Sequence, residues 1–95
     1  MTAYVIFDVE IRDPLKYQDF MNRVKPALAD AGAKYLTRGG KHRIYEGDWK
    51  PRRIVILEFP SIIAWENFYQ GPIYQGFKAI RVECSSARLV AVEST

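Results

Sequence analysis

The sequence has very little cysteine or histidine and no long apolar run. Its single cysteine, Cys84, cannot form an intrachain disulfide or hold an iron–sulfur cluster, and its single histidine cannot complete a zinc site. No apolar run approaches the roughly 18 residues of a membrane span, and the first residues, MTAYVIFDVE, lack the pattern of a secretion signal. These absences predict a cytoplasmic protein with no cofactor, no metal and no membrane partner.

Apolar side chains are plentiful enough for one hydrophobic core. Of the 95 residues, 48% are hydrophobic, which predicts a single domain over residues 1–95. The net charge of +3 comes largely from one basic stretch: Lys34, Arg38, Lys41, Arg43, Lys50, Arg52 and Arg53. A local basic stretch brings nucleic acid into consideration as a partner.

Alternating apolar residues predict the strands. Residues 3–11 alternate between two faces, and residues 52–59 are an apolar run that Pro60 ends. Residues 33–38 and 43–47 are extended on either side of Gly39-Gly40, which indicates one long strand with a bulge or bend at the glycines. Residues 87–93 form the last predicted strand.

Capping residues and helical spacing predict the helices. Asp13 as N-cap predicts a helix that ends at Gly32, with a kink or break near Asn22 because Pro26 lies inside it. Ser61 can cap a second helix that breaks at Gly71-Pro72, with a shorter helical piece after it.

The order β-α-β-β-α-β predicts an α+β, ferredoxin-like fold: a four-stranded antiparallel sheet with two helices on one face. The other face would then expose four large apolar side chains of the central strands, namely Tyr4, Ile6, Ile54 and Ile56. Each is worth roughly 1.5 to 3 kcal/mol when fully buried, so this face needs a cover. The simplest cover is a second copy, which makes a homodimeric barrel.

Four segments resemble a family of small bacterial proteins known as domain of unknown function 1330. They are RGG (38–40), EGDWKPRRIVILEFPS (46–61), YQGFKAIR (74–81) and RLVAVE (88–93). The resemblance implies a dimeric α/β-barrel, a superfamily that includes cofactor-free monooxygenases, lactone isomerases and haem-handling enzymes. It also implies a shared pocket formed by these positions: Arg38, Gly39, Gly40, Trp49, Glu58, Pro60, Ser61, Tyr74 and Arg81. Family members often have Ser-Pro-Glu-Tyr where this chain has Gly71-Pro72-Ile73-Tyr74, so a carboxylate at that site is absent here.

Glu58 is the strongest lead from the residues themselves. Alternation places it with Ile54 and Ile56 on the face without helices, where Asp8 and Glu10 of the neighbouring strand are expected to converge with it. Buried carboxylates need a basic partner such as Arg38, water, or a proton, and each arrangement makes a usable acid/base site. The alternative is an internal ion pair that only fixes the fold or the dimer.

Other residues are weaker candidates. Trp49, Tyr74, Arg81 and Arg38 are predicted ligand-binding positions, with Arg38 or Tyr74 holding an oxyanion. His42 is either a solvated loop residue or a base that contacts a ligand. Oxygen-only metal binding by the three acids stays formally open, but we predict no metal.

The RNA-recognition motif shares this topology, so RNA binding needs a separate test. The strand RRIVILEF offers Ile54, Ile56 and Glu58 where that motif offers stacking aromatics, which disfavours nucleic acid. The sequence therefore predicts a homodimer that binds a small anionic or oxygenated organic molecule in the barrel. Acid/base or cofactor-free oxidation chemistry with Glu58 or Asp8 is one hypothesis, and a non-catalytic binding or structural module is the other.

Overall fold

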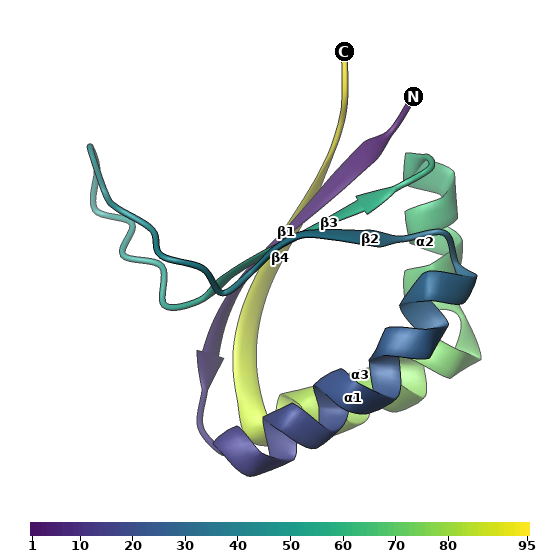
Figure 1. Ribbon diagram of the computed structural model, residues 1–95, viewed down its shortest axis with the longest axis horizontal. Coiled ribbons are helices and arrows are strands. Elements are labelled where there is room, and N and C mark those ends of the chain that lie inside the picture. The colour runs from purple at the N-terminus through teal and green to yellow at the C-terminus, as the bar shows by residue number, and fades with distance from the viewer.

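The computed structural model describes all residues 1–95 as an antiparallel sheet with helices on one face (Figure 1). The strands are β1 (Ala3–Ile11), β2 (Lys34–Arg38), β3 (Ile54–Phe59) and β4 (Ser85–Glu93), in the order β2-β3-β1-β4. All neighbouring strands are antiparallel, and β1 and β3 are central. The predicted α+β, ferredoxin-like arrangement is confirmed. No helix has the length and apolar character required to cross a membrane.

Three helices cover the sheet: α1 (Pro14–Asp30), α2 (Ile62–Gln70) and α3 (Pro72–Cys84), the last in place of the helical piece predicted after Gly71-Pro72. Asp13 and Ser61 cap α1 and α2 as expected, since their side chains accept hydrogen bonds from Lys16 N and Ala64 N. Gly71 separates α2 from α3, and α3 has 13 residues against 9 in α2. The expectation of a shorter second piece was therefore wrong.

Pro26 does not break α1, so the second of the two predicted outcomes, a kink or a break near Asn22, is absent. The helix continues to Asp30, and Pro26 itself is exposed. Proline costs the helix one backbone hydrogen bond, but Val24 and Leu28 on either side are buried in the core. Their packing holds the helix together across the missing bond.

The segment between β2 and β3 differs most from the prediction. β2 ends at Arg38, and residues 43–47 form no strand. The bulge lies between Tyr35 and Thr37, not at the glycines. Residues 39–53, which we call the arm, extend away from the helices (Figure 1), and residues 39–50 are all exposed. A strand at 43–47 would need a pairing partner, and β3 begins only at Ile54.

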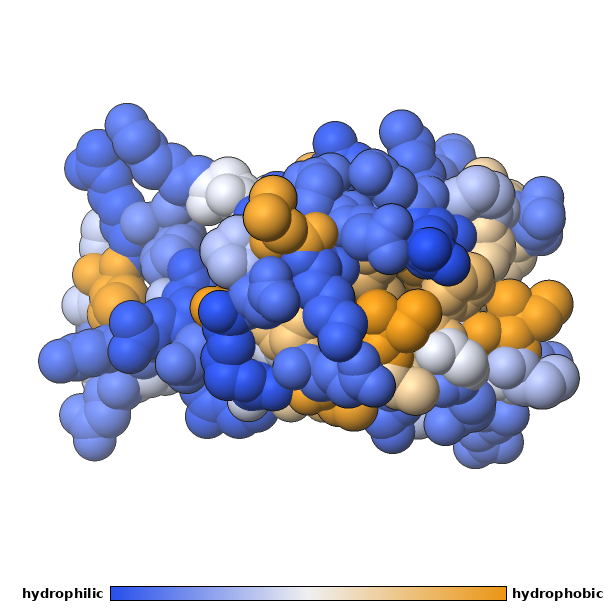
Figure 2. Space-filling view, turned by 90° about the horizontal axis from the view of Figure 1, so that it is seen from below, coloured by the Kyte–Doolittle hydropathy of each residue, from blue (hydrophilic) through white to orange (hydrophobic).

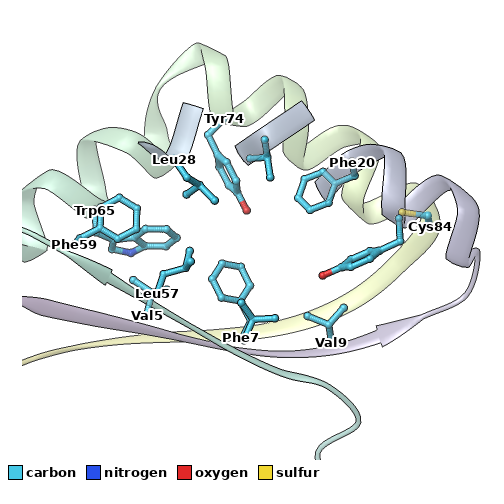
Figure 3. Packing of buried hydrophobic residues seen from close by; sticks show 13 residues of the cluster. Val5, Phe7, Val9, Phe20, Leu28, Leu57, Phe59, Trp65, Tyr74 and Cys84 are labelled. Carbon is cyan, nitrogen blue, oxygen red and sulfur yellow. The ribbon is translucent and has the colours of Figure 1, made fainter. Parts of the chain in front are cut away.

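The core lies between the sheet and the helices. Alternate residues of β1 and β3, namely Val5, Phe7, Val9, Val55, Leu57 and Phe59, are buried as predicted. Figure 3 shows how they pack against Phe20 and Leu28 of α1 and against Trp65 and Tyr74. Trp65 contacts Phe59 edge-on with ring centroids 5.3 Å apart.

The opposite side of the sheet, which we call the open face, has no cover within the chain. Tyr4, Ile6, Ile54 and Ile56 are only partly buried there. Their neighbours on β4, Val90 and Val92, are 59% and 51% exposed. By contrast, the surface seen from below in Figure 2 is mostly hydrophilic, with separate hydrophobic spots. The apolar excess expected on this face is therefore present.

Candidate functional site

A small cavity lies inside the core, between the helices and the sheet. Its volume is about 30 Å³, and 12 of its 13 lining residues are hydrophobic. Phe7 and Leu57 of the sheet, Met21 of α1 and Phe68 of α2 contribute to its walls. The thirteenth lining residue is Arg81 of α3. A cavity of this volume holds one or two water molecules, so a larger ligand requires the partly buried Met21 or Phe68 to move.

Arg81 is a buried cation without a counter-ion. Only 4% of the residue is exposed, its side chain takes part in no ion pair, and its Nε atom has no hydrogen-bond partner. An unpaired charge in an apolar core costs several kcal/mol, so such groups are rare unless they serve a ligand.

Tyr74 brings a second unpartnered polar atom to the same cavity. The residue is 3% exposed, and its hydroxyl has no hydrogen-bond partner. In Figure 3 this hydroxyl points from α3 into the space between helices and sheet. Burial raises the pKa of Tyr74, although the nearby Arg81 charge opposes the rise, so the phenol is neutral at pH 7.

The spacing of Tyr74 and Arg81 explains why they meet. They are seven residues apart on α3, which is two helical turns, so both side chains lie on the face that packs on the sheet. Tyr17 of α1 is a further buried phenol on the cavity wall. Burial raises the pKa of Tyr17, while the charges of Arg53 and Arg81 oppose the rise. The Arg53 guanidinium lies 5.8 Å from the centre of the Tyr17 ring.

Asp8 on the open face is, by contrast, fully partnered. One carboxylate oxygen accepts hydrogen bonds from Trp49 Nε1 and Arg88 Nη2, each 2.9 Å long, and the other accepts from Arg52 N at 3.0 Å. Burial alone would raise the pKa of Asp8, but these hydrogen bonds and the Arg88 charge outweigh it and lower the pKa. Asp8 therefore stays ionised and ties the base of the arm to β1.

The predicted convergence of three acids is wrong. Asp8 of β1 is opposite Ile54 of β3, whereas Glu58 is opposite Tyr4. Glu58 is therefore four residues further along β3 than the residue that faces Asp8. Four residues of a strand span roughly 13 Å. Glu58 takes part in no ion pair and has Lys34 across from it on β2, while Glu10 is exposed near the other end of the sheet.

Arg38 also lies elsewhere than predicted. It pairs in register with Val55, whose side chain faces the helices, and its guanidinium lies 5.1 Å from the centre of the Tyr35 ring. The bulge before Thr37 reverses which side chains of β2 face the helices, and that puts Arg38 on the helix side. It therefore cannot pair with Asp8 or Glu58.

The remaining candidates divide between the two faces. Tyr74 and Arg81 lie together at the cavity, Trp49 contacts Asp8 on the open face, and His42 is exposed on the arm. The catalytic roles of Asp8 and Glu58 and the binding roles of Arg38, Trp49, Tyr74, Arg81 and His42 stay predictions. Sequence reasoning missed Tyr17 and Arg53, because a tyrosine on an apolar helix face and an arginine at a strand start carry no signal of a site.

The sheet order and the helix layer define a ferredoxin-like fold. Comparison with protein families identifies the family to which the chain belongs. The chain belongs to the family described as domain of unknown function (DUF1330), whose model matches residues 2–95. No curated protein matches the sequence.

Solved structures share the fold at low sequence identity. A protein of unknown function from Rhodopseudomonas palustris has a TM-score of 0.75 at 18% identity, with 99% of this chain and 82% of that chain covered. A dimeric ferredoxin-like protein of unknown function from Jannaschia sp. CCS1 has a TM-score of 0.72 at 13% identity, covering 99% and 100%.

SnoaB, a cofactor-independent oxygenase from Streptomyces nogalater, has a TM-score of 0.58 at 11% identity, covering 99% of this chain and 91% of that chain. Such distant similarity establishes the shared fold and no activity for this chain.

Proposed function

We propose that this protein binds a small oxygenated organic molecule between the sheet and the helices. The observation that carries the proposal is a pair of buried polar residues at one cavity, Arg81 and Tyr74: Arg81 takes part in no ion pair, and neither its Nε atom nor the Tyr74 hydroxyl has a hydrogen-bond partner. A ligand oxygen can accept hydrogen bonds from both donors, while the ligand's apolar part packs against the hydrophobic walls.

The residues around the cavity favour binding over proton-transfer catalysis. Its only ionisable side chains are Tyr17, Tyr35, Tyr74 and Arg81, and no carboxylate or histidine lines it. The acids suggested as catalysts, Asp8 and Glu58, belong to the open face. An arginine and a neutral phenol can still stabilise negative charge on a bound oxygen, which is the requirement that cofactor-free oxidation of a phenol or enol places on a protein.

A second copy of the chain is the proposed cover of the open face. The support is the row of partly exposed apolar residues there, together with the dimeric state of the related protein from Jannaschia. In a homodimer these side chains would be buried against the partner, and the two sheets would form a barrel.

Fluorescence titration tests the binding proposal. Trp65 lines the cavity, and its ring centroid is 6.4 Å from that of Tyr74. In a Trp49→Phe background Trp65 is the only tryptophan, so its emission reports the cavity. We expect phenol, the probe, to change this emission saturably, and Arg81→Leu or Tyr74→Phe to weaken binding about tenfold or more.

Tyr69→Phe is the matched control, because Tyr69 packs beside Tyr74 but does not line the cavity. It should leave phenol binding unchanged. Absence of a saturable change in the parent, or equal losses in Tyr69→Phe and Tyr74→Phe, would contradict the proposal and favour a purely structural module.

A further inference from the structure

A second, more polar hollow adjoins the cavity at the start of α1. This mouth pocket, defined by the nine residues that line it, has a volume of about 490 Å³. Two of those residues, Tyr17 and Met21, also line the inner cavity. The two spaces therefore share a wall, and that wall includes the flexible side chain of Met21.

The charge of the mouth pocket is entirely positive. Lys25 of α1, Arg38 at the end of β2 and Arg53 of the arm line it, and no acidic residue does. None of the three takes part in an ion pair. Three cations around one hollow repel one another, and an anion between them would replace that repulsion with attraction.

Arg53 is held in place ahead of any ligand. Its Nη2 donates a hydrogen bond to Arg38 O at 3.2 Å, and its guanidinium lies 5.8 Å from the centre of the Tyr17 ring. Its Nε atom is buried and has no hydrogen-bond partner. Gly39, with φ of +78°, makes room for it, because a Cβ there would overlap the Arg53 guanidinium.

We infer that the mouth pocket binds the anionic group, a carboxylate or a phosphate, of a ligand whose body enters the inner cavity. This inference rests on the proposed function and narrows its ligand to a small organic anion that carries a second oxygen. Arg53 and Arg38 hold the anion with charge-assisted hydrogen bonds, and Lys25 adds a third positive charge. The second oxygen of the ligand meets Arg81 and Tyr74.

The test compares a carboxylate with its isosteric neutral amide and adds a phosphate of different shape. In the Trp49→Phe background, we would measure the affinities of 4-hydroxyphenylacetate, its neutral amide 4-hydroxyphenylacetamide, and 4-hydroxyphenyl phosphate. We expect at least one anion to bind about tenfold or more tightly than the amide, and added salt to reduce that preference. The tighter anion identifies whether the pocket suits a carboxylate or a phosphate.

Substitutions show which residues cause the preference for the anion. Arg53→Met, and separately the exposed Arg38→Met and Lys25→Met, should weaken binding of the anion more than binding of the amide and so lower the preference for the anion. Gly39→Ala removes no charge but displaces Arg53, so it should lower the preference as well. Arg43→Met removes an exposed arm cation outside the pocket and is the charge-matched control.

The outcomes separate the two proposals. If anion and amide bind equally, or if Arg43→Met lowers the preference as much as Arg38→Met, the inference about the mouth pocket is overturned while the binding function stands. If phenol binds but none of these three probes does, the inference about the mouth pocket is likewise overturned. If phenol does not bind either, the proposed function itself fails.

Discussion

Arg81 and Asp8 are both charged and poorly exposed, but they lie on opposite sides of the sheet and have opposite surroundings. Asp8 accepts hydrogen bonds from a tryptophan, a backbone amide and an arginine. Arg81 faces an apolar cavity and has no ion-pair partner. A charge whose partners are all supplied by the protein stabilises the fold. A buried charge without partners destabilises the fold, which indicates that it is retained to bind a ligand.

The largest expected effect concerns the proposed dimer rather than either charge. Ile6 lies on the central strand of the open face, so Ile6→Asp would bury a carboxylate against the partner copy. We expect the dimer dissociation constant to rise about 100-fold or more, by analytical ultracentrifugation. Leu15→Asp introduces the same charge at an 87% exposed position on α1 and should leave the dimer intact. A monomeric parent protein would refute the dimer.

The next effect is a gain in stability. Replacing the unpaired Arg81 with Leu removes a buried charge, so Arg81→Leu should raise the free energy of unfolding by about 1 to 3 kcal/mol while it weakens phenol binding about tenfold or more. Urea denaturation measures the first quantity. The exposed Arg23→Leu is the control and should change stability by less than about 0.5 kcal/mol. A strong loss of stability in Arg81→Leu would show that Arg81 is structural.

Replacing Asp8 should change the free energy of unfolding in the opposite direction to Arg81→Leu. Asp8→Asn weakens the three hydrogen bonds, so it should lower the free energy of unfolding by about 1 to 2 kcal/mol at pH 7. Because folding lowers the pKa of Asp8, its contribution is present above the unfolded value, near 3.8, and is lost as the pH falls through the folded value.

Urea denaturation of both proteins from pH 7 to pH 3 checks this: the gap between the parent and Asp8→Asn should narrow as the pH falls below about 3.8. A gap that stays constant with pH would mean that the Asp8 charge contributes nothing.

Tyr74→Phe is expected to have the smallest effect on stability. Its hydroxyl has no partner, so its removal should change the free energy of unfolding by less than about 1 kcal/mol, in either direction. Thermal unfolding measures this, with Tyr69→Phe as the reference. A loss above about 2 kcal/mol would mean that the hydroxyl has a partner in solution.

The fold was predictable because the sequence features that specify its helices and strands are local. The alternation in residues 3–11, the caps Asp13 and Ser61, and the break at Gly71-Pro72 depend on neighbouring residues, and the structure has them as predicted. The bulge in β2 was not predictable, because nothing in Tyr35, Leu36 and Thr37 marks the position at which β3 changes register.

The candidate site was only partly predictable for the same reason. Tyr74 and Arg81 were found through family resemblance and lie together at one cavity. The grouping of Asp8, Glu10 and Glu58 failed because alternation gives the face of a strand but not the register between strands. Arg38 was suggested as a partner for these acids, but one bulge reverses the alternation of β2 and places it on the helix side.

The most direct test of the account is the NMR signal of the Arg81 Nε–H group during titration with phenol, assigned by its loss in Arg81→Leu. The account predicts a signal protected from exchange with water that shifts saturably with the same affinity as the Trp65 fluorescence. An Arg81 signal that does not move while phenol binds would contradict the claim that this buried, unpartnered cation belongs to the binding site.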